Sequence, residues 1–148
     1  KYQWLANGTP IAGATGSAYA LKPAQAGATI SVRVTATSPA HPTRSATSAT
    51  TARVQAAPVA LSVRAPASVK RGKKATVRVT VTSPGLVPAG TVTIRYGGKL
   101  VAAKRLVGGV VTVKLPAQRK KGKKKLVVVY TPTTGFAGAR RTLTIKVR

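Results

Sequence analysis

The chain has 148 residues, of which 26 are lysine or arginine and none is aspartate or glutamate, so its formal net charge is +26. Because side-chain carboxylates are missing, the sequence excludes acid/base catalysis by carboxyl groups, calcium or magnesium coordination by them, and a histidine oriented by an acidic partner. Cysteine is also absent, which excludes disulfides and cysteine-ligated zinc, and no apolar run approaches the ~20 residues of a membrane span.

The first 54 residues predict a small set of β-strands. Asn7-Gly8 indicates a hairpin turn, and residues 28–35 alternate apolar with polar side chains, which is typical of a strand. One face of that strand is expected to hold Ile30, Val32 and Val34. Residues 46–54 predict the last strand of the segment, and the proline-flanked His41 is expected in an exposed loop.

A short linker and a change in charge separate this segment from the rest of the chain. Residues 55–58 end in Ala-Ala-Pro, a composition typical of a connection. Residues 1–56 contain five basic residues, whereas residues 57–148 contain the other 21. We therefore expect two domains, of which the second holds most of the positive charge.

The second domain predicts seven short strands separated by turns such as Gly97-Gly98. Residues 75–82 alternate valine with polar or basic residues, so their valines are expected to face inward. The seven predicted strands span about residues 59–65, 74–82, 91–96, 99–106, 110–115, 125–131 and 141–147. Seven antiparallel strands are typical of the simple immunoglobulin-like β-sandwich, so we predict an all-β fold.

Two basic clusters lie in predicted connections of this domain, Lys70–Lys74 between strands one and two and Arg119–Lys125 between strands five and six. In an up-and-down sandwich both connections fall at one end, together with the turn before Lys99. The eleven positive charges expected there are Lys70, Arg71, Lys73, Lys74, Lys99, Arg119, Lys120, Lys121, Lys123, Lys124 and Lys125, and we call this set the basic pole. The opposite connections contain no charged residue over 83–89, 108–109 and 132–139.

Residues 57–148 resemble bacterial immunoglobulin-like repeats, which occur in tandem on secreted and surface proteins. The matching features are Gly90-Thr-Val-Thr-Ile94, the Gly-Gly hairpins, a basic valine-rich strand after Gly122, and the stretch Tyr130–Gly138. Thr133 or Thr134 stands where the family often has aspartate. The resemblance implies a complete seven-stranded immunoglobulin-like domain over residues 59–148, in a secreted or cell-surface protein.

Residues 2–35 resemble a second repeat type, which is common in surface and secreted proteins of high-GC Gram-positive bacteria. The matching segments are Tyr2–Ile11 and Gly27–Thr35, while Gln25 replaces a usual aspartate. In such repeats the Tyr-Gln-Trp strand is the third strand, and Trp4 belongs to the core. The resemblance therefore implies that residues 1–54 form a partial immunoglobulin-like domain in a tandem pair, completed by an upstream segment or by a neighbouring chain.

No sequence motif indicates an enzyme, a cofactor or a metal site. His41 is the only histidine and has no acidic partner, and the glycine pairs fit hairpins better than phosphate-binding loops. Trp4 could form a stacking platform for a sugar or a base, but its place in the repeat pattern favours a core role. We therefore expect a non-catalytic protein.

The charge distribution predicts binding to an anionic polymer through the basic pole. Mixed charges are usual on a surface that serves only solubility, and this chain has one sign. Teichoic acid of the cell wall and extracellular DNA are the leading expected partners, bound by diffuse and salt-sensitive attraction because the pole is dominated by lysine. Two alternatives stay open: a structural stalk or filament repeat with strand exchange between chains, and an accessory tail of a secreted hydrolase or nuclease.

Overall fold

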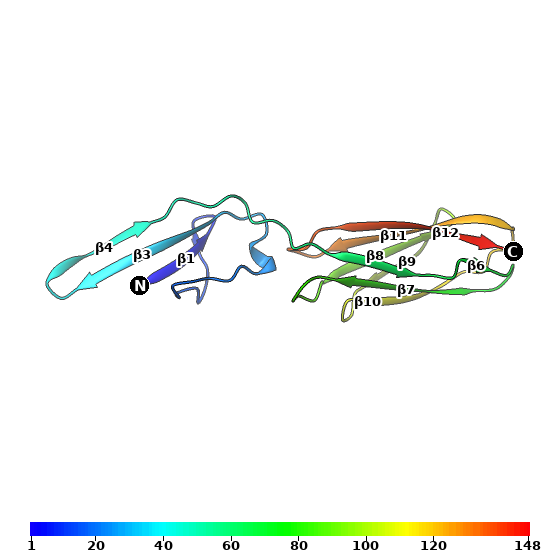
Figure 1. Cartoon of the computed structure of the whole chain (residues 1–148), viewed down its shortest axis with the longest axis horizontal. Helices are drawn as coiled ribbons and strands as arrows, with labels where there is room; N and C mark the ends of the chain where they lie inside the picture. Colours follow the sequence, from blue (N-terminus) through cyan, green and yellow to red (C-terminus); the bar gives the residue numbers. More distant parts are fainter. The chain divides into compact units, whose positions relative to one another are not determined.

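The computed structural model describes all 148 residues, and the chain is nearly all β, as the sequence predicted. It divides into two compact units, Lys1–Ala56 and Ala57–Arg148, with the division inside the predicted linker (Figure 1). None of its helical segments has the length and hydropathy needed to span a lipid bilayer.

The first unit is built on one four-stranded antiparallel sheet in the order β2-β1-β3-β4. Its strands are β1 Tyr2–Ala6, β2 Thr9–Pro10, β3 Ile30–Ser38 and β4 His41–Thr47, with a single 3-10 turn at Pro23–Gln25. Ile30 is buried, but Val34 on the same face of β3 is 39% exposed. The apolar face is thus covered at one end of the strand and open at the other.

The predicted strand at residues 46–54 is wrong in its bounds, because pairing with β3 begins at His41 and ends at Thr47. Beyond Thr47 the side chains of Ser48 and Thr51 accept hydrogen bonds from backbone N–H groups of β3, at 3.1 Å each. A side-chain hydroxyl that accepts a hydrogen bond from a strand N–H replaces the carbonyl of a neighbouring strand, so regular strand pairing ends there. Because β4 begins at His41 and lies at the edge of the sheet, this residue belongs to an edge strand rather than to a loop. It is exposed, as expected.

The second unit is a sandwich of two sheets, with strand orders β10-β7-β5 and β6-β12-β11-β8-β9. The strands are β5 Ala60–Arg64, β6 Ser68–Val69, β7 Ala75–Thr82, β8 Gly90–Tyr96, β9 Lys99–Arg105, β10 Val110–Leu115, β11 Gly122–Pro132 and β12 Ala139–Val147. All seven predicted strands are present, and the two-residue β6, which pairs in parallel with β12, was missed.

The connectivity of this sandwich differs from the predicted up-and-down order. The chain passes from one sheet to the other between β7 and β8 and between β9 and β10, so several strands that follow each other in sequence are not hydrogen-bonded neighbours. Strand direction still alternates along the chain, since β7 is antiparallel to β5, β9 to β8 and β12 to β11. Alternate connections therefore fall at the same end, as the sequence argument requires.

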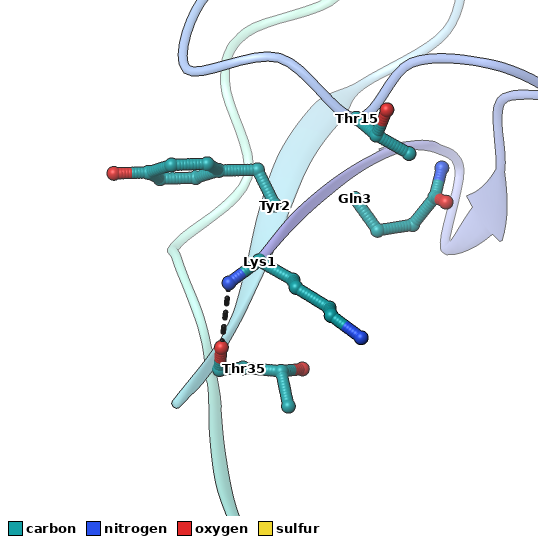
Figure 2. Close-up of a pocket in the computed structure, with 5 residues that line it drawn as sticks. All are labelled: Lys1, Tyr2, Gln3, Thr15 and Thr35. Atoms are coloured by element: carbon teal, nitrogen blue, oxygen red, sulfur yellow. Dashed lines mark hydrogen bonds between the residues drawn. The ribbon is translucent and has the colours of Figure 1, made fainter. Parts of the chain in front are cut away.

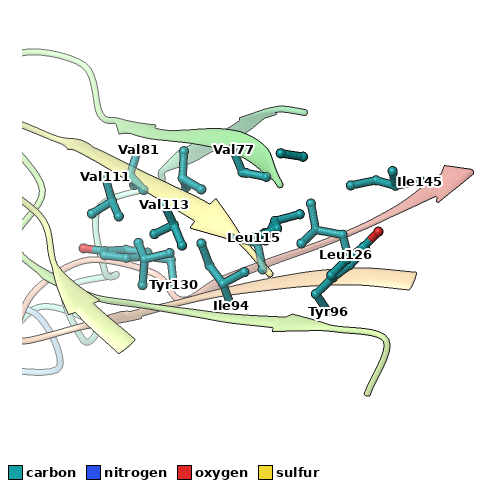
Figure 3. Packing of buried hydrophobic residues seen from close by; sticks show 14 of the residues in the cluster. Val77, Val81, Ile94, Tyr96, Val111, Val113, Leu115, Leu126, Tyr130 and Ile145 are labelled. Atoms are coloured by element: carbon teal, nitrogen blue, oxygen red, sulfur yellow. The ribbon is translucent and has the colours of Figure 1, made fainter. Parts of the chain in front are cut away.

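Side chains from both sheets fill the core between them (Figure 3). The three inward valines of β7, Val77, Val79 and Val81, are at most 1% exposed, as their alternation predicts. They belong to the same buried cluster as Ile94 and Leu126 of the other sheet. Burying one such side chain contributes about 1.5–3 kcal/mol, so this unit has the apolar core it needs to fold.

Two buried tyrosines of this core differ in their hydrogen bonding, and their hydroxyls point away from each other (Figure 3). Tyr130 Oη donates to the Ala89 carbonyl at 2.8 Å, whereas the buried Tyr96 Oη has no partner. We expect Tyr96→Phe to raise the free energy of unfolding by about 1 kcal/mol and Tyr130→Phe to lower it by a similar amount, because an unpaired buried hydroxyl costs energy and a paired one contributes it. Urea denaturation of both variants measures the difference.

The opposite signs make each tyrosine a control for the other. Equal destabilisation by the two substitutions would show that the Tyr96 hydroxyl has a partner in solution. Burial also raises the pKa of both phenols above its usual range. A raised pKa in the folded state means that stability is intact below about pH 10 and falls as pH rises further, so the comparison belongs near neutral pH.

Candidate polyanion-binding pole

Backbone hydrogen bonds hold the first basic cluster at one end of the second unit. Lys73 N donates to Lys70 O at 3.1 Å, which closes a turn around Gly72, whose φ is +75°. Gly72 N then donates to Gln118 O at 3.0 Å, and Arg71 N donates to Arg148 O at 2.7 Å. The cluster is thereby fixed beside the connection that leads into β11 and beside the end of β12.

The turn between β8 and β9 is fastened to the same end. Gly97 N donates to the Lys125 carbonyl of β11 at 2.9 Å, and Lys99 begins β9 directly after this turn. Three connections that lie far apart in the sequence therefore meet, and the structure brings all eleven residues of the basic pole to one end of the sandwich. Ten of the eleven are exposed, and Lys124 is half-buried.

Two of these lysines, Lys123 and Lys124, do not lie in a connection, contrary to the sequence prediction, whereas Lys125 was already predicted to begin a strand. Lys123, Lys124 and Lys125 belong to β11, which begins at Gly122 and pairs with β12 over this stretch. Because side chains alternate along a strand, Lys124 lies on the inward face with Leu126, whereas Lys123 and Lys125 lie on the outer face. A lysine can bury its aliphatic stem in this way and keep its ammonium in water.

Two further cations at this end were missed by the sequence analysis. Lys146 of β12 lies directly opposite Lys123, and Arg148 follows β12 at the point where Arg71 is bound. Both could have been predicted from the sequence. The seventh predicted strand runs in the same direction as strands one, three and five, so its last residues lie at the basic pole. Like charges opposite each other across strands are destabilising, so the crowding at this end has an energetic cost.

The other end of the sandwich carries no charge in its connections. Val81 N donates to Gly109 O at 2.8 Å and Thr133 N to Ala89 O at 3.2 Å, which brings residues 83–89, 108–109 and 132–139 together. None of these residues is basic. The second unit is therefore strongly polarised, and no side-chain carboxylate exists anywhere to offset the field of the basic pole.

The first unit has three hollows, and two of them differ clearly in character. One, of about 550 Å³, is lined by Lys1, Tyr2, Gln3, Thr15 and Thr35, and the backbone nitrogen of Lys1 donates to Thr35 O at 2.7 Å beside it (Figure 2). The other, of about 330 Å³, is mainly apolar and is lined by Trp4, Tyr19, Leu21, Ile30, Thr51, Ala52 and Val54.

Trp4 is half-buried in this apolar hollow. Its Nε1 donates to Gly16 O at 3.0 Å, and its ring lies 6.1 Å from the ring of Tyr19, centroid to centroid. The indole is therefore held by local contacts, with its one donor already used. That arrangement fits the structural role expected for Trp4 better than a platform for sugars or bases.

Comparison with known proteins gives a family match over most of the second unit. Residues 61–148 match the model of the bacterial Ig-like domain (group 3). No curated protein matches the chain. Among solved structures, the fibronectin(III)-like modules of Clostridium thermocellum CbhA are similar at 15% identity and a TM-score of 0.48, covering 99% of this chain and 77% of that one.

Two other solved structures are similar at comparable levels. A calcium-stabilised adhesin with which an Antarctic bacterium binds ice matches at 17% identity and a TM-score of 0.41, over 99% of this chain and 40% of the adhesin. A conjugative transposon lipoprotein of Bacteroides eggerthii matches at 14% identity and a TM-score of 0.40, over 60% of this chain and 94% of the lipoprotein.

Proposed function

Because the chain belongs to the bacterial Ig-like domain (group 3) family through residues 61–148, we propose that it is a non-catalytic module of a secreted or cell-surface protein. Its basic pole attaches that protein to an anionic polymer. The absence of aspartate, glutamate and cysteine supports the non-catalytic assignment, since these residues supply most acid, base and nucleophile roles.

The observation on which this proposal depends is the convergence of three separate connections into one cationic end. Eleven exposed or half-exposed cations gather there, while the opposite connections have none. Such crowding destabilises the folded state by self-repulsion, and an anionic ligand removes that repulsion on binding. A one-sided field of this kind also attracts polyanions over a Debye length, about 8 Å at physiological ionic strength.

The chemistry of the pole favours a phosphate polymer bound along its backbone. Nine of the eleven cations are lysines, which act as mobile point charges. The chain has one tryptophan, one phenylalanine and four tyrosines, and none lies within the two basic clusters, so stacking on bases has no platform there. Teichoic acid and extracellular DNA, both phosphodiester polymers, are the proposed ligands.

The proposal is tested with two variants that have the same net charge, +20. A pole variant changes six exposed lysines to glutamine, at positions Lys70, Lys73, Lys74, Lys120, Lys121 and Lys123. A matched variant changes six exposed cations elsewhere, at Lys22, Arg33, Arg44, Lys104, Arg105 and Arg140. Because about 1 kcal/mol per lost contact is typical of surface charge near a polyanion, the pole variant is expected to lose at least about 100-fold in affinity.

Binding to duplex DNA and to purified teichoic acid is measured by fluorescence anisotropy near physiological salt. The matched variant should keep most of its affinity, because its lost charges are distributed away from the pole. Equal losses in the two variants would show that total charge, and not the basic pole, determines binding. Preference for one polymer would separate wall anchoring from DNA binding.

A second candidate function, strand exchange within a stalk or filament, is favoured by the open sheet of the first unit. Tyr2 is 41% exposed and Val34 39% exposed on its apolar face, and β4 is an edge strand. An edge strand offers unpaired backbone groups to a strand from another chain. Sedimentation across a concentration series distinguishes the two functions, because strand exchange requires oligomers and polymer binding does not.

A further inference from the structure

We propose that the basic pole contains one specific phosphate site, formed by Arg71 and Arg119, within an otherwise diffuse positive field. This inference rests on the proposed function and deepens it. It assigns to two residues the recognition of a phosphodiester group, while the surrounding lysines supply only attraction at a distance.

The basic pole contains two arginines among nine lysines. Arg71 and Arg119 are its only two arginines, and they lie in different connections that are far apart in the sequence. They nevertheless line one hollow of about 320 Å³, together with Gly72 between them. If the two arginines were distributed at random among the eleven cations, nothing would place both of them at the same hollow. Their shared location therefore suggests a common ligand.

Backbone hydrogen bonds hold the two sides of this hollow together. The hydrogen bond from Gly72 N to Gln118 O fixes the residue immediately before Arg119 against the turn that contains Arg71. Arg71 N is held in turn by Arg148 O at 2.7 Å. Both arginines thus start from backbone positions that are tied together, which lowers the ordering cost of binding a ligand between them.

Gly72 lines the hollow together with the two arginines and has open space beside it. No heavy atom lies within 4 Å of the position that a Cβ would occupy at this residue, and its φ of +75° is one that glycine adopts without strain. Because Gly72 lines the same hollow as the two arginines, its missing side chain leaves this part of the hollow free.

The chemistry of two guanidinium groups selects phosphate over other anions. Each guanidinium offers a planar fork of N–H donors that can bind two oxygens at once, which an ammonium group cannot do. A phosphodiester presents its unesterified oxygens in tetrahedral directions, so two forks from different loops can share it. A planar carboxylate is satisfied by one fork and gains little from the second.

The test replaces both arginines by lysine, which keeps the net charge at +26. We expect Arg71→Lys/Arg119→Lys to bind a poly(glycerol phosphate) about tenfold more weakly than the unmodified protein, the loss expected when bidentate charged hydrogen bonds become single contacts. The dependence of binding on salt should not change, because no charge is lost. Binding to poly-glutamate, a carboxylate polymer, should fall less than binding to poly(glycerol phosphate), because a carboxylate uses only one of the two forks.

The control is Arg105→Lys/Arg140→Lys, two exposed arginines outside the basic pole. It should bind both polymers as the unmodified protein does, and circular dichroism checks that both double variants are folded. If Arg71→Lys/Arg119→Lys binds poly(glycerol phosphate) normally, the site is refuted, whereas a loss in the six-lysine pole variant still supports the proposed function. If the unmodified protein binds neither phosphate polymer, both proposals fail.

Discussion

Replacing Gly90 with alanine is expected to destabilise the second unit by about 3 kcal/mol or more, a large fraction of the stability of a typical domain. Gly90 is the buried first residue of β8 and pairs with Pro132 of β11. A Cβ at this position would collide with the carbonyl oxygen of Thr131, would lie 2.7 Å from Tyr130 Cε2, and would lie 2.9 Å from Pro132 Cα.

The collision is severe because two of the three atoms belong to the backbone of the neighbouring strand. A flexible side chain could move aside, but relief here requires β8 and β11 to separate. The Tyr130 hydroxyl bond to Ala89, the residue before Gly90, would be strained by the same movement. The loss therefore combines steric overlap with broken pairing at the start of the strand.

Gly138→Ala provides the matched control. Gly138 lies just before β12, and a Cβ there would meet Tyr130 O at 3.6 Å, an ordinary van der Waals distance. We expect a change below about 0.5 kcal/mol for this variant. Native-state hydrogen exchange followed by NMR reports on each unit separately, and normal protection of β8 and β11 in Gly90→Ala would contradict the prediction.

The strands of the second unit were predictable because their apolar residues repeat with the period of a strand. Val77, Val79 and Val81 alternate with polar residues, and glycine pairs mark the hairpins on either side. The same criterion failed where no apolar period exists. Lys123 and Lys124 extend β11 beyond the predicted strand through backbone pairing with β12, and the two residues of β6 are too few to show any period.

The basic pole was predictable to the extent that it depends on strand direction. Strands that alternate in direction bring the connections that contain Lys73 and Lys120 to one end, even though this sandwich does not have the up-and-down connectivity assumed from the sequence. The hollow between Arg71 and Arg119 depends instead on backbone hydrogen bonds between separate segments, above all the one from Gly72 to Gln118, and the sequence contains no signal for such bonds. Residue types can thus be predicted to share an end, but not to share a site.

The second large effect expected is a steep loss of polymer affinity with rising salt. Each phosphate neutralised by a lysine or arginine releases condensed counterions, so the logarithm of the binding constant falls with the logarithm of salt concentration by about 0.9 per contact on duplex DNA. About six to ten contacts from the basic pole would lower affinity about 10³- to 10⁵-fold between about 50 and 200 mM salt.

The slope of this plot counts the contacts, which affinity at one salt concentration cannot do. The six-lysine pole variant should show a slope that is shallower by up to about five, because each lost contact removes about 0.9. The matched variant has the same net charge but keeps the pole, so its slope should equal that of the unmodified protein. Titrations against duplex DNA at four or more salt concentrations measure all three slopes.

Equal slopes in the two variants would mean that polymer contacts are spread over the whole surface. A slope near zero in the unmodified protein would mean that the charge of the basic pole takes no part in binding, and strand exchange in the first unit would then be the function to pursue.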